Sequence, residues 1–176
     1  VEFFEENIWK IPRPRPDRDQ IKAAITLLKT SKKPLIISGG GVRYSGAGAA
    51  LAKFAKVHGI PMAETIAGKG AVMHNHEAYV GPLGIEGTDA AKEMAEGADV
   101  ILAVGTRLQD FTTGSWTTFN RETQFINVNT ARFDARKHRS LPVIGDALEC
   151  LAELDTALGD WICDSKRMKE AQELYA

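Results

Sequence analysis

Residues 35–59 read LIISGGGVRYSGAGAALAKFAKVHG, and this stretch decides the fold. A short apolar run, Leu35 to Ile37, is followed within two residues by three consecutive glycines. Side chains of one helical face then recur from Leu51 to His58, and Gly59 ends that pattern. We therefore expect a buried strand, a glycine-rich turn and a helix, in this order.

The same alternation extends along the chain in both directions. Upstream, Asp17 and Gln20 form a capping-box pattern that begins an amphipathic helix, and Pro34 ends it. Downstream, further strands are expected at residues 60–63, 100–104, 125–128 and 143–144. Helices are expected at residues 88–97 and 146–158.

Short apolar runs that alternate with helices are typical of a parallel sheet covered on both faces. We therefore predict a doubly wound, Rossmann-like α/β domain with a five- to six-stranded parallel sheet and helices on both faces. Residues 108–122 follow neither period, and a loop or a broken helix is expected there.

The composition excludes several classes of protein. The 22 Lys and Arg residues nearly balance the 23 Asp and Glu residues, so the chain lacks the basic surplus of proteins that bind nucleic acids or anionic membranes. No apolar run reaches the roughly 18 residues of a membrane span. The two cysteines, Cys150 and Cys163, form no CxxC motif, which favours a reducing, cytoplasmic location.

The length of 176 residues suits one domain, with a short segment at each end. Residues 1–16 are proline-rich and predict an inter-domain connector, residues 17–161 form the domain, and residues 162–176 begin a following linker or helix. The chain starts with Val1 and ends within a helical pattern, so we expect it to be a piece of a longer protein.

Glycines mark the carboxyl ends of three predicted strands, where open parallel sheets bind ligands. These are Gly39 to Gly41, Gly105 and Gly145. Their backbone N–H groups favour a phosphate site, although the same residues also suit a tight strand-to-helix turn. Tyr44 breaks the GxGxxG pattern and Ala47 replaces the Walker lysine, so both interpretations stay open.

Other candidate groups point to structure more than to chemistry. Arg107 could clamp a phosphate with Asp110 beside it, but a structural or interface pair is preferred. The segment His74 to Glu77 has alternate histidines without a third ligand cluster, which favours a polar loop over a metal site. Neither a GxSxG elbow nor a cysteine with a recognisable base is present, so no catalytic centre is predicted.

Taken in order, these landmarks resemble the central domain of thiamine-diphosphate-dependent enzymes, the group of acetohydroxyacid synthase and pyruvate oxidase. The resemblance covers residues 17–161. The landmarks are KKPLIISGGGVRYSGA (32–47), GIPMAETIAGKGAV (59–72), GPLGIEGTDAA (81–91), ADVILAVGTRLQDF (98–111), FINVN (125–129) and LPVIGDA (141–147).

Three longer stretches are similar to one branch of this group, the trihydroxycyclohexane-1,2-dione hydrolases of myo-inositol breakdown. They are GGGVRYSGA (39–47), GTRLQDFTTGSWTTF (105–119) and FINVNTARFDARKH (125–138). The resemblance implies a non-catalytic central domain in an enzyme that cleaves a C–C bond of a cyclic dione. The alternatives are the central domain of an enzyme like acetohydroxyacid synthase, and a stand-alone or relic domain that binds FAD, NAD or an adenine nucleotide.

The resemblance also implies where cofactors bind. Thiamine diphosphate and Mg²⁺ belong to flanking domains of a homodimeric or homotetrameric parent, because Gly145-Asp146 is followed here by Ala147 and no GDG motif exists. Some relatives hold FAD or an adenine nucleotide at the strand ends of their DHS-like nucleotide-binding fold. Asn127 and Asn129 stand where many flavin-binding relatives have Asp, which argues against flavin. The candidate cofactor-binding residues are Gly39, Gly40, Gly41, Thr65, Gly84, Gly105, Thr106, Arg107, Asn127 and Asp146.

Overall fold

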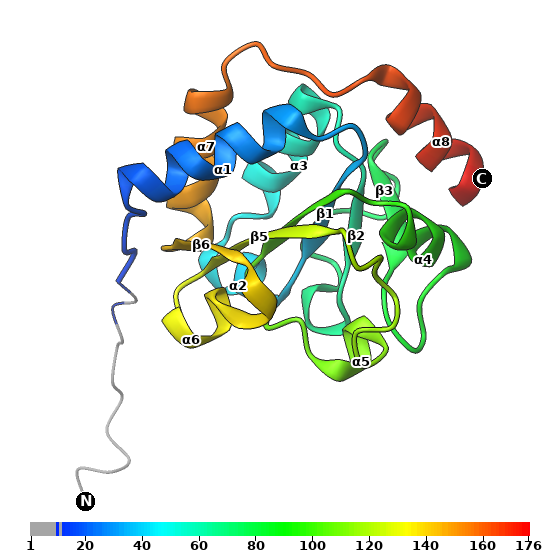
Figure 1. Cartoon of the computed structure of the whole chain (residues 1–176), viewed down its shortest axis with the longest axis horizontal. Helices are drawn as coiled ribbons and strands as arrows, with labels where there is room; N and C mark the ends of the chain where they lie inside the picture. Colours follow the sequence, from blue (N-terminus) through cyan, green and yellow to red (C-terminus); the bar gives the residue numbers. More distant parts are fainter. Residues whose placement is uncertain (1–9, 11) are drawn as a thin grey trace, which may run out of the picture.

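Six parallel strands form the central sheet, in the order β3-β2-β1-β4-β5-β6 (Figure 1). The computed structural model describes residue 10 and residues 12–176. The predicted doubly wound parallel sheet is confirmed, with six strands. Their bounds are β1 Pro34–Ser38, β2 Met62–Glu64, β3 Tyr79–Pro82, β4 Val100–Val104, β5 Gln124–Asn129 and β6 Leu141–Ile144.

The two central strands are apolar because both faces of the sheet are covered. Every residue of β1 and of β4 is buried, and the two strands pair in register from Pro34 opposite Val100 to Ser38 opposite Val104. Alternate side chains of a strand point to opposite faces. Leu35 and Ile37 therefore join the core on one face, whereas Ile36 joins the core on the other.

Helices cover both faces of the sheet. α1, α3 and α7 pack together on one face, and α4 and α8 lie together on the other (Figure 1). Short helices occupy the loops that follow the strands. The bounds are α1 Arg18–Thr30, α2 Gly40–Ser45, α3 Gly48–His58, η2 Ile66–Gly68, α4 Asp89–Glu96, α5 Asp110–Thr113, α6 Arg132–Ala135, η3 Lys137–Arg139, α7 Ala147–Leu158 and α8 Ser165–Tyr175.

The strand β3 was not expected from the sequence. Only three apolar residues, Ala78 to Val80, precede Gly81 and Pro82, and a run this short before Gly-Pro is more typical of a turn. The strand forms at the sheet edge, where it pairs with β2 on one side only. Pairing with β2 and packing against α8 stabilise β3, although its own residues have a weak preference for a strand.

Helix α8 packs back onto the domain, against β3 and α4. Arg167 anchors it, because this side chain is buried and its Nη2 donates to the carbonyl oxygen of Met94 at 2.9 Å. Its Nη1 pairs with Glu170 at 2.8 Å, so the buried charge has a partner. The predicted segment 162–176 is thus helical over most of its length.

Strand β6 forms the other edge of the sheet. Ile144 turns its backbone N–H away from β5 and donates to Oε1 of Gln20 at 2.8 Å. The backbone nitrogen of Pro142, two residues earlier, also points away from β5, but proline carries no N–H. The predicted capping box is therefore only half formed: Asp17 accepts the N–H groups of Asp19 and Gln20, but the Gln20 side chain binds β6 instead of reaching back to Asp17.

Asp99 fastens the loop before β1 to the start of β4. Its carboxylate accepts hydrogen bonds from Ser31 Oγ and from the backbone N–H groups of Lys32 and Lys33. Burial by itself raises the pKa of this carboxyl, but the hydrogen bonds outweigh burial and hold the pKa below its ordinary value. A depressed pKa in the folded state stabilises the fold above the unfolded pKa of about 4 and loses this effect as the pH falls.

Replacing Asp99 with asparagine is expected to lower the free energy of unfolding at pH 7 by about 1 kcal/mol. The same change should flatten the loss of stability below about pH 4, because the variant has no carboxylate to protonate at this site. Urea unfolding between acidic and neutral pH measures both effects. Asp160→Asn, at an exposed position after α7, is the control and should leave the curve unchanged. Parallel pH curves for Asp99→Asn and the unmodified chain would contradict the assignment.

Candidate functional site

The strand order reverses between β1 and β4, and the carboxyl ends of these two strands define the candidate site. β2 and β3 extend the sheet on the β1 side, and β5 and β6 extend it on the β4 side. Gly39 follows β1 directly and Gly105 follows β4. The predicted glycines therefore meet at the topological switch point, where open α/β sheets form ligand crevices.

The glycines meet in direct backbone contact. The N–H of Gly39 donates to Val104 O and the N–H of Gly41 donates to Gly105 O, both at 2.8 Å. Gly105 has a φ of +63°, and a Cβ on Gly41 would lie 2.7 Å from its Cα. The tight turn thus accounts for these glycines, and two N–H groups of the triple glycine already have protein acceptors.

Three other predicted residues support the loops of this edge. Thr65 caps η2 by accepting the N–H of Gly68 at 3.2 Å. The Thr106 hydroxyl accepts the N–H of Leu108 at 3.1 Å. Gly84, with a φ of +129°, lies so close to the backbone of α5 that a Cβ there would meet Phe111 O at 2.5 Å.

Asn127 lies in β5 and is fully buried. Its amide nitrogen donates to Asp134 O at 3.0 Å and thereby holds α6 against the strand. Its Oδ1 has no hydrogen-bond partner among the described residues. The Asn127 amide therefore joins β5 to α6 and lines neither of the two cavities described below.

Two cavities flank the glycine contact. One of 520 Å³, here called the β2-side cavity, lies toward β2, and one of 470 Å³, the β5-side cavity, lies toward β5 and β6. Four residues line both: Gly41, Tyr44, Gly105 and Arg107.

Seven of the ten predicted cofactor-binding residues line these cavities, and Gly39, Gly84 and Asn127 do not. The β2-side cavity is lined by Gly40, Gly41, Thr65, Gly105, Thr106 and Arg107. Asp146 lines the β5-side cavity.

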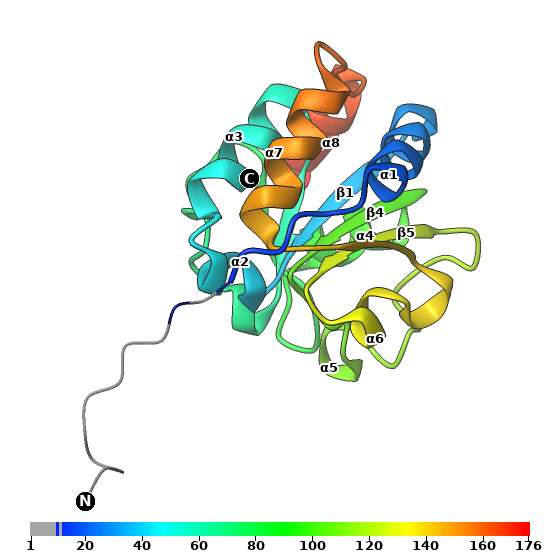
Figure 2. The ribbon, with the colours of Figure 1, turned by 90° about the vertical axis from the view of Figure 1, so that its left-hand side faces the viewer.

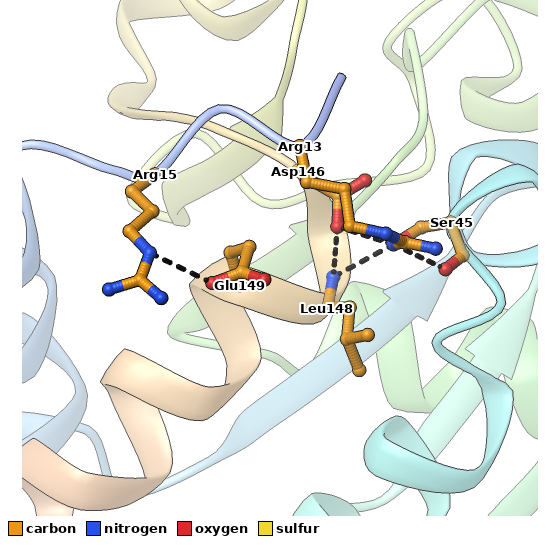
Figure 3. A network of polar contacts seen from close by, with 6 residues as sticks. All are labelled: Arg13, Arg15, Ser45, Asp146, Leu148 and Glu149. Atoms are coloured by element: carbon orange, nitrogen blue, oxygen red, sulfur yellow. Dashed lines mark hydrogen bonds and ion pairs between the residues drawn. The ribbon is translucent and has the colours of Figure 1, made fainter. Parts of the chain in front are cut away.

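Asp146 is held by an arginine from the connector that precedes α1 (Figure 3). Nη1 of Arg13 lies 3.0 Å from Asp146 Oδ1 and 2.7 Å from Ser45 O. The same carboxylate oxygen accepts the Ser45 hydroxyl at 2.7 Å and the N–H of Leu148 at 3.1 Å. Asp146 therefore caps α7 and binds the connector, and its side chain is engaged before any ligand arrives.

Two further contacts fix the connector across the end of β6. The N–H of Asp146 donates to Pro14 O at 2.8 Å, and Arg15 pairs with Glu149 at 3.2 Å. Gly145 leaves room for this crossing, because a Cβ there would lie 3.1 Å from Pro14 O. Of the predicted connector 1–16, residues 1–9 and 11 lie outside the described part.

Sequence reasoning missed Arg13 and Ser45. Their contacts join positions 133 and 101 residues from Asp146, and such pairs leave no local pattern. The only hint is the Arg-Pro repeat PRPRP at residues 12–16, which places charged side chains on an extended segment.

Arg107 is an exposed cation at this edge. It lines both cavities, and within the described part of the chain it takes part in no hydrogen bond or ion pair. The structural pair with Asp110 that the sequence favoured is not among the salt bridges of the described residues. The guanidinium therefore remains available to an anion.

The two cysteines lack the features of an activated thiol. Burial, with the nearby carboxylates Asp146 and Glu149, raises the pKa of the Cys150 thiol to about 12, and burial also raises that of Cys163. No cluster of three His, Cys, Asp or Glu suited to a metal is found in residues 10 and 12–176. Among these residues, no helix has both the length and the apolar character that a membrane crossing requires.

The residues at this edge do not fit thiamine diphosphate. The chain has two Gly-Asp sequences, and neither completes GDG: Gly145-Asp146 is followed by Ala147 and Gly159-Asp160 by Trp161. The carboxylate that would bind Mg²⁺ is already bonded to Arg13, Ser45 and the start of α7. The described residues at this edge are therefore assigned no step of thiamine chemistry.

Comparison with known proteins places the chain in a family. The family model described as the central domain of thiamine pyrophosphate enzymes matches residues 21–154. A protein named 3D-(3,5/4)-trihydroxycyclohexane-1,2-dione hydrolase from Clostridium perfringens is 43% identical over 157 residues, which cover 89% of this chain and 25% of the relative.

Two more relatives carry the same name. The protein from Geobacillus thermodenitrificans is 40% identical over 91% of this chain, and that from Halalkalibacterium halodurans is 42% identical over 88% of it. The matched residues are 25% and 24% of these relatives, so the chain spans about a quarter of their length. The chain belongs to the thiamine pyrophosphate enzyme family, in which it is the central domain.

Proposed function

We propose that this chain is the non-catalytic central domain of a thiamine-diphosphate-dependent hydrolase that opens the ring of trihydroxycyclohexane-1,2-dione. The observation that carries the proposal is 40–43% identity, over about nine tenths of this chain, to relatives that bear this name. The parent is a cytoplasmic homodimer or homotetramer, and its flanking domains bind thiamine diphosphate and Mg²⁺.

The role of this domain in the parent is to position its neighbours. The connector is fixed by Arg13 to Asp146 and by Arg15 to Glu149, both across the carboxyl end of β6. These contacts set where the preceding polypeptide leaves the domain. A connector held in a fixed direction suits an enzyme whose cofactor site is assembled from other domains, because those domains must be positioned accurately.

Isothermal calorimetry of the 176-residue chain with thiamine diphosphate and Mg²⁺ tests the non-catalytic role. No binding is expected, since Asp146 is engaged and the GDG motif is incomplete. Micromolar binding by this chain would overturn the proposal.

Activity of the parent polypeptide tests the substrate. Release of a ring-opened acid from the dione is expected. Condensation of two pyruvate molecules, with no action on the dione, would favour instead the alternative of an enzyme like acetohydroxyacid synthase.

A second candidate function, binding of an adenine nucleotide, is favoured by one observation. Arg107 is exposed at the border of two cavities that together contain seven predicted residues. The nucleotide diphosphate would lie against Arg107 and the N–H of Gly40, with Thr65 nearby. A tightly held flavin fits less well, because the Asn127 side chain is fully buried within the domain and Asp146 binds Arg13.

Titration of the chain with ADP, NAD and FAD tests this candidate. If ADP binds, Arg107→Ala should weaken the affinity by about tenfold or more, because a charge-assisted contact to phosphate is lost. Arg132→Ala, an exposed arginine that lines neither cavity, is the matched control. No binding of the three nucleotides would leave the domain purely structural.

A further inference from the structure

Residues 12–16 of the connector lie on the surface of the domain. Figure 2 shows them in dark blue, running from beside α2 toward the start of α1. Pro12, Arg13, Pro14 and Arg15 are exposed, and Pro16 is half-buried. Among the described residues, those that form the two hydrophobic cores include none of these five. We call this segment the strap. Because it buries little apolar surface, polar contacts must hold it in place.

The polar contacts of the strap converge on the start of α7 (Figure 3). Nη1 of Arg13 donates to Asp146 Oδ1 at 3.0 Å, and the N–H of Asp146 donates to Pro14 O at 2.8 Å. Arg15 also pairs with Glu149 at 3.2 Å, but its side chain is 75% exposed and such a pair contributes little. The strap is therefore fastened chiefly at one residue, Asp146.

The strap covers one side of the β5-side cavity. Pro12 and Pro14 line this cavity of 470 Å³, and Ser45, Asp146 and Ala147 line it from the domain. An exposed segment with few attachments opens at a lower free energy than the core of a domain. Lifting the strap would therefore open the cavity to solvent and uncover the Asp146 carboxylate without separating the strands.

The Asp146 carboxylate is oriented independently of the strap. Its Oδ1 also accepts the Ser45 hydroxyl at 2.7 Å and the N–H of Leu148 at 3.1 Å, and neither donor belongs to the strap. The Asp146 side chain is 7% exposed, whereas that of Arg13 is 42% exposed. Arg13 thus reaches from the surface to a carboxylate that other groups already position. Another group with N–H or O–H donors would find the same acceptor once Arg13 withdrew.

We propose that the strap is an autoinhibitory cover of the β5-side cavity. It opens as a unit while the rest of the domain stays folded, and in the closed state Arg13 occupies the acceptor site of Asp146. A ligand of this site carries a guanidinium, amino or hydroxyl group that replaces Arg13. The structure describes the closed state, in which the connector keeps its fixed direction. The proposal concerns this chain alone and does not depend on the substrate of the parent.

Native-state hydrogen exchange of the 176-residue chain tests independent opening. The Asp146 amide donates to Pro14 O in the strap. The amides of Gly145 and Cys150 donate instead to carbonyl oxygens within the domain. The Asp146 amide should therefore be about tenfold less protected than the other two. Equal protection of the three amides would overturn the proposal, because the strap would then open only together with the domain.

Removing the main attachment should favour the open state. Arg13→Ala is expected to increase exchange of the Asp146 amide about tenfold, because a charge-assisted hydrogen bond is lost. The Gly145 and Cys150 amides should not change, which also shows that the variant is folded. Arg18→Ala, at an exposed position at the start of α1, is the matched control and should leave all three amides unchanged. An unaltered Asp146 amide in Arg13→Ala would overturn the role of Arg13 as the fastening.

A reporter thiol tests whether the strap covers the cavity. Ala147 lines the β5-side cavity and is 5% exposed, and Cys150 and Cys163 are buried. In a chain with Ala147→Cys, iodoacetamide should alkylate the new thiol about tenfold faster when Arg13→Ala is also present. Arg18→Ala should not accelerate the reaction, and tandem mass spectrometry assigns the label to a residue. Equal alkylation rates with and without Arg13→Ala would overturn the proposal, because lifting the strap would then not open the cavity.

Methylguanidinium, which carries the donor group of Arg13, tests the acceptor site. Added to Arg13→Ala, this ion should shift the amide resonances of Asp146 and Leu148 in NMR spectra, because it takes the vacated place on the carboxylate. Tetramethylammonium, a cation without N–H donors, is the control and should leave both resonances unchanged. No shift with methylguanidinium, or equal shifts with the two ions, would overturn the proposal that Arg13 fills a site for a ligand's donor group.

Discussion

Replacing Gly39 with alanine is expected to lower the free energy of unfolding by about 3 kcal/mol, close to the upper end for overpacking. A Cβ at this position would lie 2.5 Å from Thr106 Cβ and 2.7 Å from the carbonyl carbon of Gly105. Both neighbours belong to the loop after β4, which is tied to β1 by the hydrogen bond from Gly39 N to Val104 O. Neither side of the contact can yield without separating the two central strands.

The matched control is Gly46→Ala. This glycine ends α2 with a φ of +67° and has nothing within 4 Å of an added Cβ. Only the backbone preference is lost there, so a decrease of about 1 kcal/mol is expected. Urea unfolding of the two variants compares them, and equal losses would show that close packing at the switch point is not what requires Gly39.

Replacing His58 with alanine should destabilise the fold by about 3 kcal/mol, from lost buried hydrogen bonds and the cavity that remains. The imidazole is fully buried at the end of α3. Its Nδ1 lies 2.7 Å from Trp161 O and its Nε2 lies 3.0 Å from Asp155 Oδ1. The His58 carbonyl also accepts the N–H of Cys163 at 2.9 Å. One residue thus joins α3, α7 and the link to α8.

Hydrogen exchange locates this effect. The amides of Trp161 and Cys163 should exchange faster in His58→Ala, because both neighbour the lost contact. His74→Ala, at an exposed position of the loop before β3, should change stability by less than about 0.5 kcal/mol. Unchanged exchange at Trp161 and Cys163 would show that the histidine does not hold the link.

The fold was predictable from the sequence where a strand is a continuous apolar run. β1, β4 and β5 are buried apolar runs, and the predicted limits agree with the structure within one residue. The strand β3 could not be predicted, because it depends on pairing with β2 and on cover by α8. Residues 108–122 were expected to be irregular, and only the short helix α5 forms there.

The site was predictable to a similar extent. Glycines at strand ends indicated the edge on which the cavities lie, because parallel topology brings strand ends together. The sequence could not distinguish an N–H group that is free from one that meets a carbonyl, as in Gly41 and Gly105. It also gave no sign that Arg13 would reach Asp146, since that contact depends on the complete fold.

The edge strand β6 has a consequence for assembly. A strand from a second copy would pair with both the N–H and the carbonyl groups of this edge, and β6 offers no free N–H at its outward positions Pro142 and Ile144. Growth of the sheet from molecule to molecule, the first step of edge-to-edge aggregation, is therefore disfavoured at β6, because half of the pairing groups are missing.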